Sequence, residues 1–124
     1  MIAVAQQENN AQGAFRALAD PTRRDILFLL SERDMSICDI ASQYVITRAA
    51  VKKHLIILEE GGLISVRVNG RERINRLEPL GLKTANDWFE HFNHFWSDRL
   101  SKLKEVVEKA EKKNNQSTKG HQLE

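Results

Sequence analysis

The chain has 124 residues, which is enough for one domain around a single hydrophobic core but not for two. Charged residues make up 29% of it, and its formal net charge of +2 is compatible with a polyanionic partner without requiring one. The single cysteine, Cys38, excludes an internal disulfide bond. No apolar run is long enough to span a bilayer and the N-terminus lacks the pattern of a secretory signal, so we expect a cytoplasmic protein without a membrane partner.

The composition divides the chain into three parts. Residues 1–10 are polar and are expected to be a flexible N-terminus, whereas residues 111–124 are too polar to fold and are expected to be a disordered tail. The folded domain is therefore expected over residues 11–110. It should begin with a short helix at residues 11–19, whose apolar side chains must pack against other elements.

Asp20-Pro21 predicts the start of a second helix, which should run to about Ser31. An aspartate can cap a helix, and a proline in the first helical position loses only an amide hydrogen that has no partner. Arg23 and Arg24 lie near this start, where they oppose the helix dipole, so they either bind a phosphate or form solvated surface. The side chains that this helix should bury are Ile26, Leu27, Leu29 and Leu30.

Two further capped helices follow at close spacing. Ser36 can cap a short helix that ends near Gln43 or Tyr44, and Thr47 can cap a longer helix that stops at Gly61-Gly62. Only a few residues separate the two helices. This arrangement is typical of a helix-turn-helix.

The helix after Thr47 has two different sides. Val51, Leu55 and Leu58 recur at i, i+4 and i+7 and form an apolar stripe. The other side carries small and basic residues and one isoleucine, namely Arg48, Ala49, Lys52, Lys53 and Ile56. Arginine and lysine can reach phosphates and base acceptors in a major groove, and alanine allows close approach. A solvated basic face would show the same pattern, so the neighbouring elements decide between the two interpretations.

Asn69-Gly70 separates two extended segments and predicts a β-hairpin. A two-residue loop would mix apolar and charged side chains on both faces. A three-residue loop over residues 68–70 would instead place Ile64, Val66 and Ile74 on one face and Arg67, Arg71 and Arg73 on the other. The second register is favoured because it gives one buried face. It sets Arg67 opposite Arg71, a like-charge pair that costs stability unless an anion lies between them.

A long helix is predicted from about Leu80 to Lys112. One broad stripe of it is apolar and rich in aromatic side chains: Ala85, Trp88, Phe92, Phe95, Trp96, Leu103 and Val106. The other helices already supply a core, so an exposed stripe of this size would be a liability. Packing against a second copy of the chain is the simplest way to bury this stripe. A symmetric dimer would also present two copies of the basic helix.

Several motifs in one order resemble the ArsR family of bacterial repressors. They are Phe15–Leu27, Cys38–Ala41, Val51–Leu55 with Leu58, Gly62–Ile64 and Gly70–Arg73, and the resemblance covers roughly residues 11–105. The stretch from Trp88 through Phe95-Trp96 to Leu103 is similar to a branch of the family that does not sense metals. Members of that branch are often encoded beside START-type ligand-binding proteins.

This resemblance implies a winged helix-turn-helix fold, mainly α, with a two-stranded wing and a long C-terminal helix for dimerisation. Thr47–Glu60 would be the recognition helix, and the wing would lie along the flanking backbone or minor groove. The residues expected to contact DNA are Thr47, Arg48, Ala49, Lys52, Lys53, Arg67, Asn69, Gly70, Arg71 and Arg73. Those expected in a homodimer interface of the first and last helices are Phe15, Leu18, Trp88, Phe92, Phe95, Trp96 and Leu103. The chain has Lys52-Lys53 where the commonest family pattern has Ser-Arg, so the operator sequence does not follow.

Metal sensing is the first alternative. Relatives that bind soft metals through thiols carry Cys-x-Cys, but Ser36 occupies the first position here, so Cys38 is expected to be a buried structural cysteine. A zinc site could instead use four residues of the long helix at i, i+4, i+7 and i+11, namely Asp87, His91, His94 and Asp98. Any surface helix shows polar residues opposite an apolar stripe, so ordinary surface is the expectation for these four. His54 is expected to be structural.

The sequence contains no Gly-rich phosphate loop, no activated nucleophile and no recognisable carboxylate pair, so no enzyme is predicted. We interpret the chain as a homodimeric repressor that binds an imperfect palindrome in double-stranded DNA without a cofactor. The alternatives are a zinc-responsive repressor and a winged-helix module whose basic face binds an acidic protein. The sequence does not identify an inducer, whether a small molecule or a protein.

Overall fold

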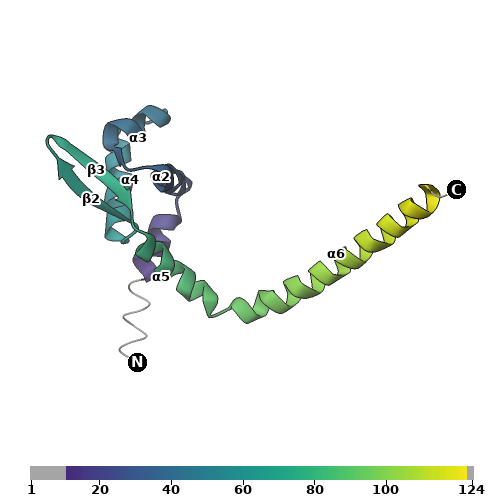
Figure 1. Ribbon diagram of the computed structural model, residues 1–124. Helices are drawn as coiled ribbons and strands as arrows, with labels where there is room; N and C mark the ends of the chain where they lie inside the picture. The colour runs from purple at the N-terminus through teal and green to yellow at the C-terminus, as the bar shows by residue number, and fades with distance from the viewer. Residues whose placement is uncertain (1–10, 123–124) are drawn as a thin grey trace, which may run out of the picture. The chain divides into compact units, whose positions relative to one another are not determined.

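The structure, a computed structural model, describes the backbone of residues 11–122 and the side chains of residues 11–115. The chain divides into two units, Met1–Trp88 and Phe89–Glu124, which are described separately. The described part of the first unit begins with a helix at residues 11–18. The elements that follow are α2 (Pro21–Glu32), β1 (Met35–Ser36), α3 (Ile37–Gln43), α4 (Arg48–Glu60), β2 (Ile64–Asn69), β3 (Glu72–Leu77), α5 (Pro79–Glu90) and α6 (Asn93–Gln122). All of them except the short β1 are labelled in Figure 1.

The predicted side-chain caps begin α2, α3 and α4. Asp20 caps α2, with a proline at the first helical position. Ser36 Oγ accepts from the Asp39 amide at 3.2 Å while the Asp39 carboxylate accepts from the Ser36 amide at 3.3 Å, which is a capping box. Thr47 Oγ1 accepts from the Ala50 amide at 3.1 Å. The helix-turn-helix is therefore confirmed, with helix starts where the sequence predicts them.

A Schellman motif ends α4. Gly62 has a φ of +73°, and its amide donates to the Glu59 carbonyl at 2.9 Å. The amide of Leu63 donates to the Leu58 carbonyl at 3.0 Å, which completes the motif. The predicted left-handed stop is confirmed at Gly62, whereas Gly61 keeps a right-handed conformation with a φ of −77°.

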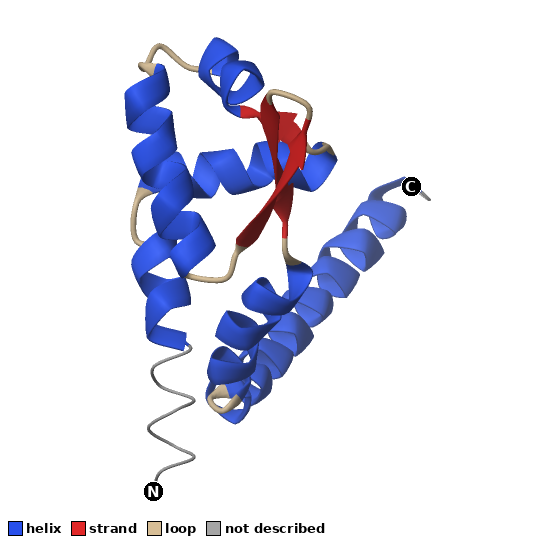
Figure 2. Ribbon diagram, turned by 90° about the vertical axis from the view of Figure 1, so that its left-hand side faces the viewer, coloured by secondary structure: helices blue, strands red, loops and turns tan. Residues whose placement is uncertain are grey.

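The sheet has one strand more than the sequence predicts. It is antiparallel with the strand order β1-β3-β2, and the short β1 lies beside β3 among the red strands of Figure 2. Met35 of β1 is opposite Asn75 of β3. The side-chain amide of Asn75 is buried and donates to the Met35 carbonyl at 3.1 Å. A strand of two residues is too short to show an alternating pattern of apolar and polar residues, so the sequence did not indicate β1.

Both predicted hairpin registers are wrong. Asn69 pairs with Glu72, so the turn consists of Gly70 and Arg71 rather than residues 69–70 or 68–70. Gly70 has a φ of +66°, as predicted, and no described non-glycine residue has a positive φ. A positive φ at the first central residue alone is the pattern of a type II′ turn, whose twist matches that of the strands.

The observed register gives the hairpin different faces from those predicted. Arg67 is opposite Ile74, so the predicted Arg67–Arg71 pair does not form. The inner face carries Ile64, Val66, Asn75 and Leu77, which alternate with the outer residues on each strand. The prediction failed because it treated the hairpin alone and assigned apolar residues to the buried face. In the structure, β1 provides a hydrogen-bond acceptor that allows Asn75 to be the buried residue.

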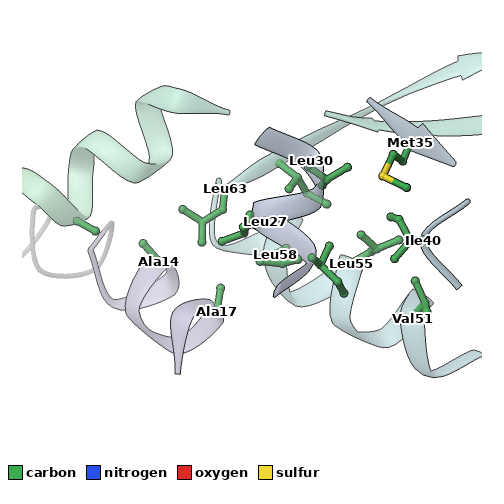
Figure 3. Packing of buried hydrophobic residues seen from close by; sticks show 13 residues of the cluster. Ala14, Ala17, Leu27, Leu30, Met35, Ile40, Val51, Leu55, Leu58 and Leu63 are labelled. Atoms are coloured by element: carbon green, nitrogen blue, oxygen red, sulfur yellow. The ribbon is translucent and has the colours of Figure 1, made fainter. Parts of the chain in front are cut away.

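One hydrophobic core lies between the first helix, α2, α4 and the inner face of the sheet. The stripe of α4 is buried, with Val51 and Leu58 fully inaccessible and Leu55 nearly so (Figure 3). Of the α2 residues predicted to be buried, Leu29 is only partly covered. The other buried members are Ala14, Ala17, Ile26, Leu27, Leu30, Met35, Ile40, Leu63, Ile64 and Ala85.

Backbones approach closely at two glycines of the first unit. A Cβ atom at Gly61 would lie 2.6 Å from the Gly13 carbonyl oxygen, so the first helix packs directly on the end of α4. A Cβ atom at Gly81 would overlap the carbonyl oxygen of Gly62 and lie 2.7 Å from its carbon. These contacts require glycine because any side chain would displace backbone on the other side.

The predicted single helix from Leu80 to Lys112 is wrong. α5 ends at Glu90 and α6 begins at Asn93. Between them the amide of Phe92 donates to the carbonyl three residues earlier, at 3.0 Å, in place of the four-residue helical spacing. α6 continues to Gln122, so residues 111–122, expected to be a disordered tail, are helical here. Residues 1–10, expected to be flexible, and residues 123–124 lie outside the described part.

Among the described residues, every helix is either too short or too polar to traverse a lipid bilayer.

We expect Gly81→Ala to lower the free energy of unfolding by more than about 2 kcal/mol, because backbone atoms on both sides of the contact must move. Urea denaturation followed by circular dichroism measures the effect. Gly13→Ala is the matched control, since its Cβ would lie 3.4 Å from the Gly61 Cα and alanine favours helix. Equal stability of Gly81→Ala and the parent protein would contradict the packing described.

Candidate nucleic-acid interface

The N-terminal half of α4 presents a cationic face to solvent. Arg48, Ala49, Lys52 and Lys53 are all exposed, and Ile56 is 45% exposed. The apolar stripe on the other side of the same helix is buried, so the helix cannot rotate without exposing it. The predicted division of this helix into two sides is therefore confirmed.

Arg23 connects the first described helix with α2 and α4. Its Nε donates to the Ala17 carbonyl at 2.8 Å and its Nη2 donates to the Arg16 carbonyl at 2.9 Å. Its Nη1 lies 3.5 Å from Nδ1 of His54 on α4, and Asp20 Oδ2 lies 3.9 Å from the same nitrogen. The His54 side chain is 23% exposed and takes part in packing between helices, as predicted for a structural histidine.

Of the two alternatives predicted for Arg23 and Arg24, a bound phosphate or solvated surface, Arg24 is exposed as the second has it and Arg23 is partly buried, but neither alternative included their contacts with the first helix. Arg24 Nη1 donates to the Leu18 carbonyl at 2.7 Å, so both guanidinium groups complete the carbonyl end of the first helix. The backbone N–H of Arg23 donates to Asp20 and lowers the pKa of that carboxyl, and the charges of His54 and Arg23 lower it further against the effect of burial. These contacts join the first helix, α2 and α4.

The wing arginines do not share one face. Arg67 is opposite Ile74 and forms an ion pair with Asp34 at 3.4 Å. Arg73 lies on the other face of the hairpin, and Arg71 is in the turn. The predicted grouping of three arginines on one surface is therefore wrong, because it depended on the wrong register. Arg71 and Arg73 remain exposed.

A cavity of about 360 Å³ lies between the start of α3, the first two turns of α4 and the tip of the hairpin. We call it the wing cavity and define it by its lining residues, Ser36, Ile37, Cys38, Arg48, Ala49, Lys52, Arg71, Glu72 and Arg73. It brings together two of the predicted groups, the cations of α4 and those of the wing. Arg67 and Lys53 are not among its lining residues.

The sequence did not indicate that the start of α3 contributes to this site. Cys38 was predicted to be buried, but it is exposed and lines the wing cavity. Ser36, two residues earlier, is buried instead, and its hydroxyl caps α3. The start of α3 meets the wing because β1 pairs with β3, a contact between short segments that no local pattern predicts.

The geometry required for the zinc candidate is absent from the described residues. Asp87 lies on α5 and forms an ion pair with Lys83 at 3.0 Å, whereas His94 and Asp98 lie on α6 and His91 lies between the helices. The predicted spacing needs one continuous helix to place four side chains on one face. No group of three or more potential metal ligands occurs among the residues that the structure describes.

The aromatic residues expected at a dimer interface are only partly covered. Phe15 packs edge-on against Trp88 with ring centroids 5.3 Å apart. Trp88 is still 41% exposed, although it lies in the first unit. On the second unit the exposed apolar side chains recur at three- and four-residue spacing: Phe92, Phe95, Trp96, Leu100, Leu103, Val106 and Val107. Phe92 and α6 therefore carry an apolar stripe that the second unit itself leaves exposed.

A helix-turn-helix followed by a hairpin, with cations on the exposed side of its second helix, defines a winged-helix DNA-binding domain. The family profile described as "Bacterial regulatory protein, arsR family" matches residues 20–66. The chain is 30% identical over 95 residues to the HTH-type transcriptional regulator Rv2034 of Mycobacterium tuberculosis, covering 77% of this chain and 86% of that protein. It is 36% identical over 78 residues to the transcriptional repressor SdpR of Bacillus subtilis, covering 63% of this chain and 87% of that protein.

Solved structures agree with these matches. An ArsR-like transcriptional regulator from Rhodococcus sp. RHA1 is 31% identical and superimposes with a TM-score of 0.64, covering 79% of this chain and 92% of that one. The chain belongs to the ArsR family of bacterial transcriptional regulators. The relatives are named as regulators rather than enzymes, which confirms the prediction that the protein is not an enzyme.

We expect Arg23→Ala to lower the free energy of unfolding by about 1–3 kcal/mol, because it removes the two carbonyl contacts and the contact with α4. Arg24→Ala removes a single exposed hydrogen bond and should change stability by less than about 0.5 kcal/mol. Urea denaturation of both variants measures the difference. Equal effects of the two substitutions would show that Arg23 does not join the helices energetically.

Proposed function

We propose that this protein is a homodimeric transcriptional repressor that binds an imperfect palindrome in double-stranded DNA. The observation that carries the proposal is the exposed cationic face of α4, which is fixed opposite a fully buried stripe. In a dimer the two copies of α4 would enter successive major grooves. Each wing would contact the flanking phosphate backbone. Because operator DNA lies in the bacterial cytoplasm, a cytoplasmic location is part of the same proposal.

The residues predicted to contact DNA fall into groups with different chemical roles. Arg48, Lys52 and Lys53 supply phosphate or base contacts from α4, and Ala49 allows the helix to approach base edges. Thr47 lies at the start of α4, where a helix N-terminus and its amides favour phosphate. The wing supplies backbone contacts through residues 67–73. Arg71 and Arg73 form no ion pair among the described residues, whereas Arg67 is paired with Asp34.

Two features support a repressor that acts as a dimer. SdpR is named a transcriptional repressor, and a structure from Mycobacterium bovis is described as a homodimeric winged helix-turn-helix DNA-binding domain, at 24% identity and a TM-score of 0.56. The second unit leaves the apolar stripe of α6 exposed, and a second copy of the chain would bury it. The residues proposed for the interface are Phe15, Leu18, Trp88, Phe92, Phe95, Trp96 and Leu103.

We expect Lys53→Ala to weaken binding to the operator by about 1–3 kcal/mol if Lys53 contacts a base. The operator is first obtained by selecting bound genomic fragments, and affinities are then measured by fluorescence anisotropy at several salt concentrations. A similar loss on random duplex would assign Lys53 to a phosphate instead. Lys83→Ala is the control, since this exposed lysine of α5 pairs with Asp87.

A DNA-binding repressor that neutralises several phosphates should lose affinity linearly on a log–log plot as salt rises. If the protein binds no genomic fragment better than random duplex, sequence-specific repression is excluded. The surface would then fit a module that binds an acidic protein.

We expect Trp96→Asp to dissociate the dimer, because it places a charge in the middle of the apolar stripe of α6. Sedimentation velocity measures the oligomeric state, and operator binding should fall with it. Ser101→Asp adds the same charge at an exposed polar position of α6 and should leave the dimer intact. An intact dimer in Trp96→Asp would contradict the proposed interface.

A further inference from the structure

The wing cavity has the size of a small-molecule site as well as the charge of a DNA-binding surface. Its volume of about 360 Å³ is within the range of about 300–1,000 Å³ that is common for ligand pockets. Three separate elements form its walls: the start of α3, the first two turns of α4 and the hairpin tip. The wing cavity is open to solvent, and a small ligand in it would contact side chains from all three elements.

The charge of the cavity is unbalanced. Arg48, Lys52, Arg71 and Arg73 line it together with one carboxylate, that of Glu72, which leaves a net charge of +3. Among the described residues, none of these four cations forms an ion pair, whereas Arg67 nearby is paired with Asp34. Cations gathered without counter-charges repel one another, and a bound anion relieves that repulsion.

The chemistry of the lining favours a phosphate group. Arginine guanidinium groups bind phosphate oxygens through paired hydrogen bonds, and the cavity has three arginines on two elements. Ile37 and Ala49 add apolar surface beside these cations. A phosphate monoester carries about two negative charges near neutral pH, twice the charge of each phosphodiester of a DNA backbone.

We propose that the wing cavity binds a small phosphate-monoester dianion in the DNA-free protein, and that this ligand competes with DNA. The binding itself does not depend on the function proposed above, but the competition with DNA does. A bound dianion neutralises two of the three excess charges and occupies the space between the recognition helix and the wing. It therefore removes cations that would otherwise contact the DNA backbone.

Cys38 provides a direct reporter, because it is the single cysteine of the chain, is exposed and lines the cavity. The full-length protein is labelled with monobromobimane, an uncharged thiol reagent, at constant ionic strength. Adenosine 5′-monophosphate and inorganic phosphate are the probes, and adenosine is the uncharged control. At a probe concentration ten times its dissociation constant, labelling should slow about tenfold because the free fraction falls to about one-eleventh. Adenosine should leave the rate unchanged.

Two variants on the same strand test the location. Arg73→Gln removes a cation from the cavity wall and should abolish protection by adenosine 5′-monophosphate. Arg76→Gln removes an exposed cation of β3 outside the cavity and should retain protection. Equal protection in both variants would overturn the proposal, since the anion would then act elsewhere.

The same labelling experiment with operator duplex as the probe distinguishes a small phosphate ligand from the phosphates of DNA. If adenosine 5′-monophosphate slows labelling and also weakens operator binding, the proposal is supported. If duplex protects Cys38 but neither adenosine 5′-monophosphate nor inorganic phosphate does at millimolar concentration, the cavity binds only DNA phosphates. The proposal is then overturned while the proposed function stands. If the free anions protect but the protein binds no duplex, the ligand site stands and both the competition and the proposed function fail.

Discussion

Burial of three side chains, Val51, Leu55 and Leu58, fixes the rotation of α4, and the cationic face depends on that rotation. Each buried leucine or valine contributes about 1.5–3 kcal/mol, whereas repulsion between exposed cations one turn apart costs about 0.2–0.5 kcal/mol per pair. The apolar stripe therefore determines which side is buried, and Arg48, Lys52 and Lys53 remain in solvent. The Thr47 cap and the Schellman motif at Gly62 set the two ends of the helix, so its position along the axis is fixed as well.

The carboxylates of the described domain are distributed unevenly over its cations. Asp20 faces Arg23 and His54 behind the recognition helix, and Asp34 pairs with Arg67 on the outer side of the wing. The cations between α4 and the hairpin tip have only Glu72 nearby. Arg23 and Arg67 thus have a carboxylate nearby, whereas Arg48, Lys52, Arg71 and Arg73, which line the wing cavity, form no ion pair among the described residues. A formal net charge of +2 conceals this separation, because it averages over the whole chain.

Local rules predicted much of this fold, and contacts between distant segments account for what they missed. Caps at Asp20, Ser36 and Thr47 follow from side chains beside their own amides, so the helix starts could be placed from the sequence. The hairpin register could not, because it depends on a buried Asn75 whose acceptor comes from a two-residue strand forty positions earlier. The pairing of the same strand with β3 also brings the start of α3, with the exposed Cys38, to the wing. The break between α5 and α6 was missed because the apolar period continues across it.

The contact between Gly13 and Gly61 has a mechanical consequence. The first helix and the end of α4 meet backbone to backbone, with no side chain between them whose rotamer could change. A displacement of the first helix cannot be absorbed by repacking at that point and must move the end of α4 with it. The guanidinium of Arg23 on α2 adds a second connection, because it contacts carbonyls of the first helix and His54 of α4. A change in quaternary arrangement that shifted the first helix would consequently reach the recognition helix as a rigid-body movement.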